Sequence, residues 1–118
     1  MKKRPHKWNS HHPIYLQLMN ELIGGILDRR YPEGEMLPSV RQLAEIYDVN
    51  PLTAAKAYKE LARDGLIETL RGEGLVVKPS ARATLLKTER AKFLKEEWPE
   101  LHKRLTRLEL DLKTLYSE

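Results

Sequence analysis

Residues 37–77 decide the fold of this chain, and they read LPSVRQLAEIYDVNPLTAAKAYKELARDGLIETLRGEGLVV. Ser39 and Gln42 have the spacing of a capping box, in which each side chain satisfies a free backbone N–H of the first helical turn. The sequence therefore predicts a helix that begins after Ser39. Its apolar positions run out near residues 47–48, where we expect it to stop.

A second helix start follows almost at once. Asn50 is a preferred N-cap residue, and proline is tolerated at the first helical position, which is the place of Pro51. This helix is predicted to run to about Arg63. Gly65 then suits the left-handed position just after a helix end.

Two short strands are predicted next, over residues 66–70 and 75–78. The tip between them is Arg71-Gly72-Glu73-Gly74. Two helices joined by a short turn, with a glycine hairpin behind them, describe a winged helix-turn-helix. In such folds the second of the two helices enters the major groove of DNA. The fold class expected is mainly α with a small β-hairpin wing.

The segment before residue 37 supplies one more helix, predicted over residues 14–29. Its apolar stripe repeats every four residues, at Ile14, Leu18, Leu22 and Ile26. Gly24-Gly25 lies inside this helix and lowers its propensity by about 1 kcal/mol per glycine. We expect close packing of another backbone there as the compensation.

The helix predicted from Asn50 to Arg63 has two different faces at about 100° per residue. One face is apolar and consists of Ala54, Ala57, Tyr58 and Leu61. The other carries three cations and one apolar side chain: Leu52, Lys56, Lys59 and Arg63. Lys56 can reach a guanine edge or a phosphate, and Leu52 can pack on a thymine methyl. A plain solvated helix face is the alternative that this pattern leaves open.

The two ends of the chain differ from this centre. Residues 1–12 form a basic arm with Lys2, Lys3, Arg4 and Lys7. Residues 80–118 are predicted as a two-helix tail, interrupted at Trp98-Pro99 because the residue before a proline avoids helical angles. Leucines spaced 4, 3, 4, 3 give a heptad seam at Leu101, Leu105, Leu108, Leu112 and Leu115. With Leu86 and Phe93, these residues are predicted to dimerise the chain.

The composition excludes several classes of protein. The chain has 118 residues and no cysteine, which excludes disulfides, cysteine-ligated zinc and a thiol nucleophile. Its longest apolar run, residues 22–27, is far shorter than the roughly 20 residues of a membrane span. No apolar signal-peptide stretch follows Met1, and we expect a cytoplasmic protein without membrane contact. The net charge of +4 favours an anionic partner only weakly.

Six blocks follow one another in register over residues 13–78. They are Pro13-Ile14-Tyr15-Leu16-Gln17-Leu18, Leu37-Pro38-Ser39-Val40-Arg41-Gln42-Leu43-Ala44, Val49-Asn50-Pro51-Leu52-Thr53, Ala57-Tyr58-Lys59-Glu60-Leu61, Gly65-Leu66-Ile67-Glu68 and Arg71-Gly72-Glu73-Gly74. Together they closely resemble the DNA-binding domain of bacterial transcription regulators of the GntR family. The resemblance implies a winged helix-turn-helix domain over residues 13–79.

The resemblance also implies which side chains contact DNA. Arg41 matches an arginine of the family that contacts phosphate or base, and Ser39 matches a capping position beside the DNA backbone. The full set is Ser39, Arg41, Asn50, Leu52, Thr53, Lys56, Arg71 and Gly72. Three positions depart from the family pattern. Arg29 replaces a glycine, Ala54 replaces a β-branched residue, and Glu73 places an acid in the wing, which weakens its grip on phosphates.

The length after the winged domain points to a subfamily. About 40 residues remain, which resembles the small YtrA-like regulators, whose short helical tail mediates dimerisation and which often control transporter operons. We therefore expect a homodimeric repressor that binds a palindromic operator. The same fold could also serve a metal- or small-molecule-responsive switch, with an effector that the sequence does not name, or a protein-interaction module.

Other functions find less support in the residues. The histidines His6, His11, His12 and His102 lack an i, i+4 pair and a placed carboxylate, so we expect no metal site. No Ser-His-acid or paired-carboxylate arrangement indicates an enzyme, and no cofactor is expected. Trp8 and Trp98 are interpreted as packing anchors.

Overall fold

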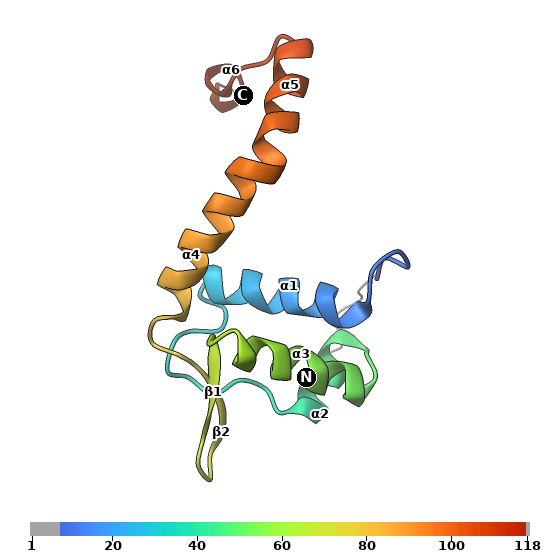
Figure 1. Cartoon of the computed structure of the whole chain (residues 1–118), viewed down its shortest axis with the longest axis vertical. Coiled ribbons are helices and arrows are strands. Elements are labelled where there is room, and N and C mark those ends of the chain that lie inside the picture. The colour runs from blue at the N-terminus through green and yellow to red at the C-terminus, as the bar shows by residue number, and fades with distance from the viewer. Residues whose placement is uncertain (1–7, 118) are drawn as a thin grey trace. The chain divides into compact units, whose positions relative to one another are not determined.

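The computed structural model describes residues 8–117 and divides the chain into two compact units, residues 1–85 and 86–118. The basic side chains predicted for the arm, Lys2, Lys3, Arg4 and Lys7, lie outside the described residues. The elements of the first unit follow the predicted order (Figure 1). They are α1 (Ile14–Leu27), α2 (Val40–Tyr47), α3 (Pro51–Arg63), β1 (Ile67–Leu70), β2 (Gly74–Val77) and the start of α4 (Ala81–Lys92).

Both predicted N-caps are confirmed. The Ser39 hydroxyl accepts the N–H of Gln42 (3.1 Å), and the Gln42 side chain accepts the N–H of Ser39 (2.9 Å), which completes the capping box of α2. Asn50 Oδ1 accepts the N–H of Leu52 (2.8 Å), and Pro51 is the first residue of α3. These local contacts fix where the two helices begin.

The core of the first unit lies between the three helices and the hairpin. Its largest fully buried side chains are Tyr47, Leu18, Leu22, Ile26, Leu43, Leu61, Ile67 and Val77. α2 and α3 bury the faces that their apolar periods predict, and α1 buries Leu18, Leu22 and Ile26 of its predicted stripe. Ile14, the first position of that stripe, is 41% exposed. The start of α4 joins this core through Ala81 and Leu85.

Residues 8–12, which belong to the predicted basic arm, are folded back on α1. The side chain of Gln17 holds them: its Oε1 accepts the N–H of Asn9 (2.7 Å), and its Nε2 donates to the carbonyls of Asn9 (2.6 Å) and His12 (2.9 Å). Trp8 packs against the core, with its ring centroid 6.5 Å from that of Tyr47. This part of the arm is therefore packed structure.

Two helices of the first unit end in the same hydrogen-bond pattern. After α1, the left-handed residue is Arg29 (φ 63°), whose N–H donates to Ile26 O, while the next N–H donates to Gly25 O. After α3, the corresponding residue is Gly65 (φ 78°), as predicted. Both ends are Schellman motifs, in which the N–H groups of the left-handed residue and of the residue after it each satisfy one free carbonyl. Arg29 thus occupies the position that the resemblance assigns to glycine.

We expected another backbone to pack closely against Gly24-Gly25. In the structure a side chain packs there instead. A Cβ on Gly25 would collide with the ring of Tyr31, whereas a Cβ on Gly24 would meet nothing within 4 Å. The prediction of close packing is right for Gly25 alone, and its stated partner is wrong. The Tyr31 ring lies at Gly25 because the turn after α1 brings it back over the helix, with the Tyr31 N–H bonded to Gly25 O (3.0 Å).

The wing is the antiparallel pair β1 and β2, with Ile67 opposite Val77. The segment before α2 extends this small sheet through bridges from Glu33 to Val77 and from Met36 to Val76. The hairpin is therefore tied at its base to the chain that leads into α2, and its tip extends away from the helices in Figure 1.

The second unit is helical but differs from the predicted tail in two ways. Between α4 and α5 (Trp98–Arg107) lies η1 (Phe93–Glu97), a π-helical segment, and Trp98 keeps helical angles before Pro99. The predicted interruption is therefore a widened turn. The Trp98 N–H donates to Phe93 O, five residues back, and Pro99 has no N–H to donate.

The heptad seam predicted over residues 101–115 is wrong as a continuous helix. α5 ends at Arg107, Glu109 is left-handed (φ 57°), and α6 (Leu112–Tyr116) starts anew with Asp111 as its N-cap. A third Schellman motif closes α5, because the N–H of Leu110 reaches the carbonyl of Leu105 (2.9 Å). The leucine spacing continues through this turn, although the helix does not.

Candidate nucleic-acid interface

The turn between α2 and α3 sets the angle of the candidate recognition helix. Asp48 caps α2 in the left-handed conformation (φ 54°), and the N–H of Val49 donates to Ala44 O (2.9 Å). Asn50 then starts α3 directly, so only three residues separate the two helices. Asparagine and aspartate tolerate left-handed angles better than most residues, which allows so short a turn.

A buried tyrosine fixes α3 against the entrance of α2. The Tyr58 hydroxyl donates to the carbonyl of Pro38 (2.6 Å), just before the Ser39 cap. Burial raises the pKa of Tyr58 well above its usual value, with smaller contributions from Tyr31 and Tyr47. The neutral hydroxyl therefore persists as a donor, and it holds the two helices in register.

The outward face of α3 is arranged as its sequence predicts. Ala54, Ala57, Tyr58 and Leu61 are buried, and Leu52, Lys56, Lys59 and Arg63 are exposed. Leu52 leaves 80% of its surface exposed in the first turn of the helix. An isolated apolar side chain among cations suits a base edge with a methyl group.

The three cations of this face differ in the contacts that their side chains make. Lys56 Nζ lies 4.2 Å from the ring centroid of Tyr15, at the start of α1. Arg63 forms an ion pair with Glu60 (3.7 Å), one turn back on α3. Such an exposed pair contributes little to stability, and a phosphate can displace it. Lys59 is exposed on the same face.

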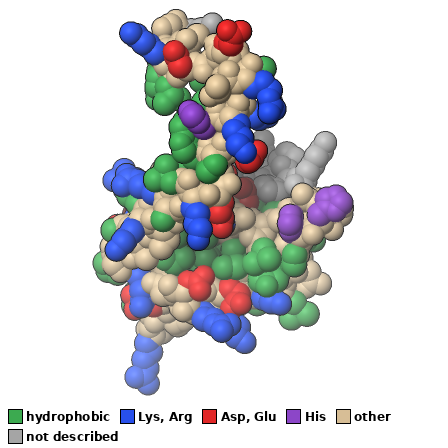
Figure 2. Space-filling model, turned by 45° about the horizontal axis from the view of Figure 1, so that its top comes forward, with side chains coloured by type: hydrophobic (Ala, Val, Ile, Leu, Met, Phe, Trp, Pro, Cys, Tyr) green, Lys and Arg blue, Asp and Glu red, His purple; other side chains and the backbone are tan. Residues whose placement is uncertain are grey.

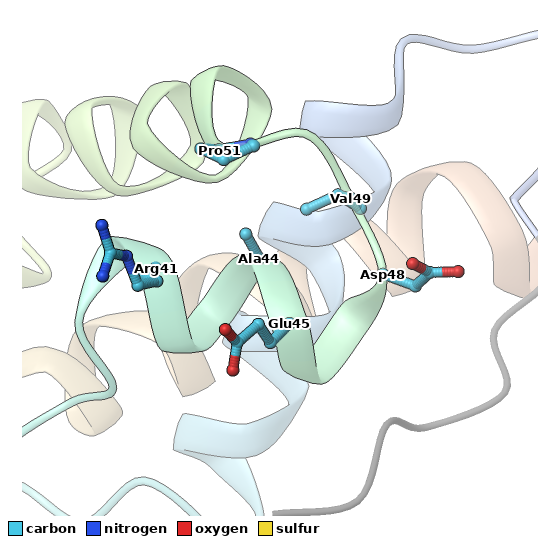
Figure 3. Close-up of a pocket in the computed structure, with 6 residues that line it drawn as sticks. All are labelled: Arg41, Ala44, Glu45, Asp48, Val49 and Pro51. Carbon is cyan, nitrogen blue, oxygen red and sulfur yellow. The ribbon is translucent and has the colours of Figure 1, made fainter.

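Arg41, in the first turn of α2, lines one end of a hollow of about 430 Å³ between α2 and α3 (Figure 3). Ala44, Val49 and Pro51 form its apolar part, and Glu45 and Asp48 add carboxylates at its border. In Figure 3 the guanidinium of Arg41 and the carboxylate of Asp48 lie at opposite ends. The exposed guanidinium is therefore available to a phosphate or a base.

The wing tip presents Arg71, which is exposed. The N–H of Glu73 donates to Leu70 O (3.0 Å), and Gly72 (φ 78°) and Gly74 (φ 122°) take the left-handed angles of this turn. Glycine is needed there because a Cβ would be strained. Glu73, two residues after Arg71, is also exposed, and its carboxylate reduces the net positive charge of the tip.

On the face of the molecule that Figure 2 shows, charge is distributed in small groups. The face shown in Figure 2 carries Lys and Arg side chains with acidic side chains between them. This agrees with a net charge of only +4. Binding to an anion would then depend on the local placement of a few cations.

The structure brings most of the predicted residues onto two neighbouring helices. Ser39 caps α2, and Arg41 lies in its first turn. Asn50 caps α3, Leu52 and Thr53 lie in its first turn, and Lys56 lies near its middle, while Arg71 and Gly72 lie apart at the wing tip. The Oγ of Ser39 and the Oδ1 of Asn50 serve as caps, and Thr53 is half-buried. Tyr15 and Tyr58 are the contributions that sequence reasoning missed. Their contacts join residues that are 41 and 20 positions apart in the chain, and no local pattern signals them.

The sequence profile of the bacterial regulatory proteins, gntR family, matches residues 14–77, which is more than half of this chain. This chain belongs to the GntR family. The HTH-type transcriptional repressor YtrA from Bacillus subtilis is 43% identical to it over 89 residues, 75% of this chain and 68% of YtrA. The members of the GntR family, YtrA among them, are transcription regulators and not enzymes.

Two solved structures have a similar fold. YtrA from Sulfolobus acidocaldarius, a GntR-family transcription factor, superposes with a TM-score of 0.59 at 27% identity, covering 90% of this chain and 99% of that one. The DNA-binding domain of AraR, solved in complex with operator ORX1, gives a TM-score of 0.53 at 22% identity, with 65% and 94% covered.

Metal binding and membrane insertion are two other properties on which the structure bears. Within residues 8–117, no group of three His, Cys, Asp or Glu side chains is placed to hold a metal ion. The part of the GntR chain that the structure describes contains no helix long and apolar enough to cross a membrane.

Proposed function

We propose that this GntR protein is a homodimeric repressor that occupies a palindromic DNA operator of a transporter-type operon. The observation that carries the proposal is the outward face of α3, where an 80% exposed leucine stands among three exposed cations. Because its target is chromosomal DNA, we place its action in the cytoplasm.

DNA contacts are assigned to the starts of the two helices and to the wing. Leu52 and Lys56 face the major groove, and Arg41 reaches the phosphates or a base beside it. The exposed Arg71 at the wing tip meets the backbone. Ser39, Asn50, Thr53 and Gly72 shape these contacts. The AraR domain, which shares this fold, was solved in complex with an operator, and this supports DNA as the partner.

A protein-interaction module is the competing function of a winged helix. Such a module would present an apolar patch on α3, since exposed apolar surface is what a protein partner covers. The described face of α3 has one exposed large apolar side chain, Leu52, and its neighbours are charged. This distribution favours DNA.

The dimer is assigned to the second unit. Phe93, Leu101, Leu108, Leu112 and Leu115 all leave more than a third of their surface exposed. Leu86 and Leu105 are half-buried and complete the predicted set. A helical segment with this much exposed apolar surface is stabilised by a partner, and a second copy of the chain supplies the same surface. One winged helix contacts few phosphates, so a dimer that reads two half-sites also gains affinity.

The transporter operon rests on the similarity to YtrA-like regulators alone. Deleting the gene should raise the transcription of its target operon, measured as RNA levels across the genome. If the operons that respond encode no membrane transporter, this part of the proposal is wrong, and the DNA-binding part stands.

The dimer mechanism is tested on the duplex that the chain selects from a pool of random sequences. That duplex should be a palindrome whose half-site centres lie about 34–36 Å apart. Inserting about five base pairs turns one half-site to the opposite side of the duplex, and footprinting should then show weak protection of both halves. Undiminished affinity would mean that monomers bind independently.

Salt dependence supplies a second measurement. A dimer that uses Arg41, Lys56 and Arg71 from each protomer, with part of the basic arm, should neutralise about 6–8 phosphates. The plot of log affinity against log salt should then have a slope of about −5 to −7. A slope near zero would exclude a phosphate-based interface.

A further inference from the structure

The contact between Lys56 and Tyr15 joins the middle of α3 to the start of α1. The ammonium lies 4.2 Å from the ring centroid, well within the range of a cation–π interaction. Tyr15 is half-buried and Lys56 is exposed. α1 and α3 lie side by side in the first unit (Figure 1), so a ring on one can support a side chain on the other.

The helical positions of α3 show where this contact directs the lysine. At about 100° per residue, Leu52 lies within about 10° of the direction opposite the buried positions of α3, and Lys56 and Lys59 flank that direction by about 30° on either side. Lys56 lies about 40° from Leu52, and its ammonium is held on the side of α1. A helix in the major groove presents its outermost ridge to the base edges at the groove floor, whereas its flanks face the phosphates of the groove walls.

We propose that Tyr15 is a positioning residue for DNA binding: it holds Lys56 on the α1 flank of α3, where the ammonium binds a phosphate, and leaves the base edges to Leu52. This inference rests on the proposed DNA-binding function and changes the role of Lys56 within it. Sequence reasoning allowed Lys56 either a guanine edge or a phosphate, and the contact with Tyr15 favours the phosphate.

The physical gain is preorganisation. A free lysine side chain samples many rotamers, and fixing it on a phosphate costs conformational entropy. A ring that holds the ammonium before DNA arrives has already restricted those rotamers. The interaction leaves the charge in place and the ammonium exposed, so its N–H donors remain available to a phosphate.

The test measures binding of the full chain to two duplexes, the one selected from random sequence and a scrambled duplex of the same composition. The variants are Tyr15→Leu, Tyr15→Phe, Lys56→Gln and the double variant Tyr15→Leu with Lys56→Gln. Tyr15→Phe is the matched control, because phenylalanine keeps the ring face. Thermal unfolding of each variant shows whether the fold is retained.

Tyr15→Leu should weaken binding to both duplexes by a similar factor, about three- to tenfold, because phosphate contacts are independent of sequence. Tyr15→Phe should stay within about twofold of the wild type. In the Lys56→Gln background, Tyr15→Leu should cause no further loss. Lys56→Gln should also make the salt slope shallower by about 1 for each phosphate that the lysine neutralises in the wild type.

Three results would overturn the inference. In the first, Tyr15→Leu binds both duplexes as tightly as the wild type does. In the second, its loss of affinity is confined to the selected duplex. In the third, its loss of affinity adds fully to the loss caused by Lys56→Gln. If Tyr15→Leu unfolds, a fluorinated phenylalanine at position 15 keeps the shape of the ring and weakens its negative face, and it must bind both duplexes more weakly than Tyr15→Phe. A wild-type chain without preference for the selected duplex would contradict the proposed function itself, which separates the two failures.

Discussion

The ring of Tyr31 occupies the space in which a side chain on Gly25 would lie. The hydroxyl of the same tyrosine shares a hydrogen bond with the hydroxyl of Tyr47 (3.1 Å), so the ring cannot move away without breaking that bond. Gly25→Ala should therefore destabilise the first unit by about 1–3 kcal/mol, through overpacking.

Gly24→Ala is the matched control for this effect. Gly24 has the same helical environment, and nothing lies within 4 Å of its added Cβ. The substitution should stabilise the protein by about 0.5–1 kcal/mol, from helix propensity alone. Urea unfolding of the two variants measures both values, and equal effects at the two positions would contradict the packing argument.

The left-handed residue that closes α1 offers a stabilising substitution. Arg29 has φ 63°, which costs a residue with a Cβ about 1–2 kcal/mol. Arg29→Gly should raise the free energy of unfolding by about 1 kcal/mol. At the equivalent position after α3, Gly65→Ala should lower it by a similar amount, although its Cβ would meet no atom within 4 Å. Thermal melts that move in the same direction for both variants would exclude backbone strain as the cause.

The Asn50 cap separates stability from DNA binding. Asn50→Ala removes the acceptor for the N–H of Leu52 and should cost about 1 kcal/mol of stability. Asn50→Asp keeps an acceptor oxygen and should leave the melting temperature nearly unchanged. Its negative charge should nevertheless weaken DNA binding by repelling phosphates. If Asn50→Asp binds DNA as the wild type does, this end of α3 is not near the backbone.

Tyr58 predicts a dependence of stability on alkaline pH. Its folded pKa is raised above its usual 10.0 by burial, so the unfolded chain loses the hydroxyl proton first as pH rises. The wild type should therefore lose stability above about pH 10, because the unfolded state binds fewer protons there. Tyr58→Phe should be less stable at neutral pH by about 1–3 kcal/mol, since the Pro38 carbonyl loses its donor. Its stability should fall less steeply above about pH 10, and parallel pH curves for both proteins would contradict this account.

The tail leucines predict a change of oligomeric state. Leu101 and Leu105 lie one turn apart within α5, so both can be replaced without touching the end of the helix, where Leu108 is the C-cap residue. Replacing both with Asp should give monomers by light scattering, because burying two carboxylates in an apolar interface is costly. Leu52→Asp is the control: it should remain dimeric and lose DNA binding. Dimers in the tail variant would place the interface elsewhere.

Local signals were enough to predict most of the first unit. The capping box of Ser39 and Gln42, the Asn50-Pro51 start and the Gly65 stop all depend on residues two to four positions apart. A short peptide contains the whole of such an interaction, so its pattern can be recognised in the sequence. The outward face of α3 was predictable for a similar reason, because helical periodicity alone separates it from the buried face.

The tail shows where a local pattern misleads. The leucine spacing predicted one helix through residues 101–115, but Asp111 caps a new helix by accepting the N–H of Thr114 (2.6 Å), and this contact lowers the pKa of Asp111. The cap at Asp111 was the sequence signal that competed with the heptad. Spacing constrains which residues share a face, whereas a cap and a left-handed Glu109 decide whether the helix continues.

The sequence by itself determined the order of the elements, the helix caps and the composition of the α3 face, because each follows from chain neighbours. Only the tertiary structure decided that Tyr31 packs on Gly25, that Tyr58 reaches Pro38 and that Lys56 lies over Tyr15. These contacts join residues 6, 20 and 41 positions apart. The packing of the helices and the turn that folds back after α1 decide which residues meet. The chain has five tyrosines, and the sequence does not say which of them makes each contact. Packing geometry selects one of them, and no local pattern records that choice.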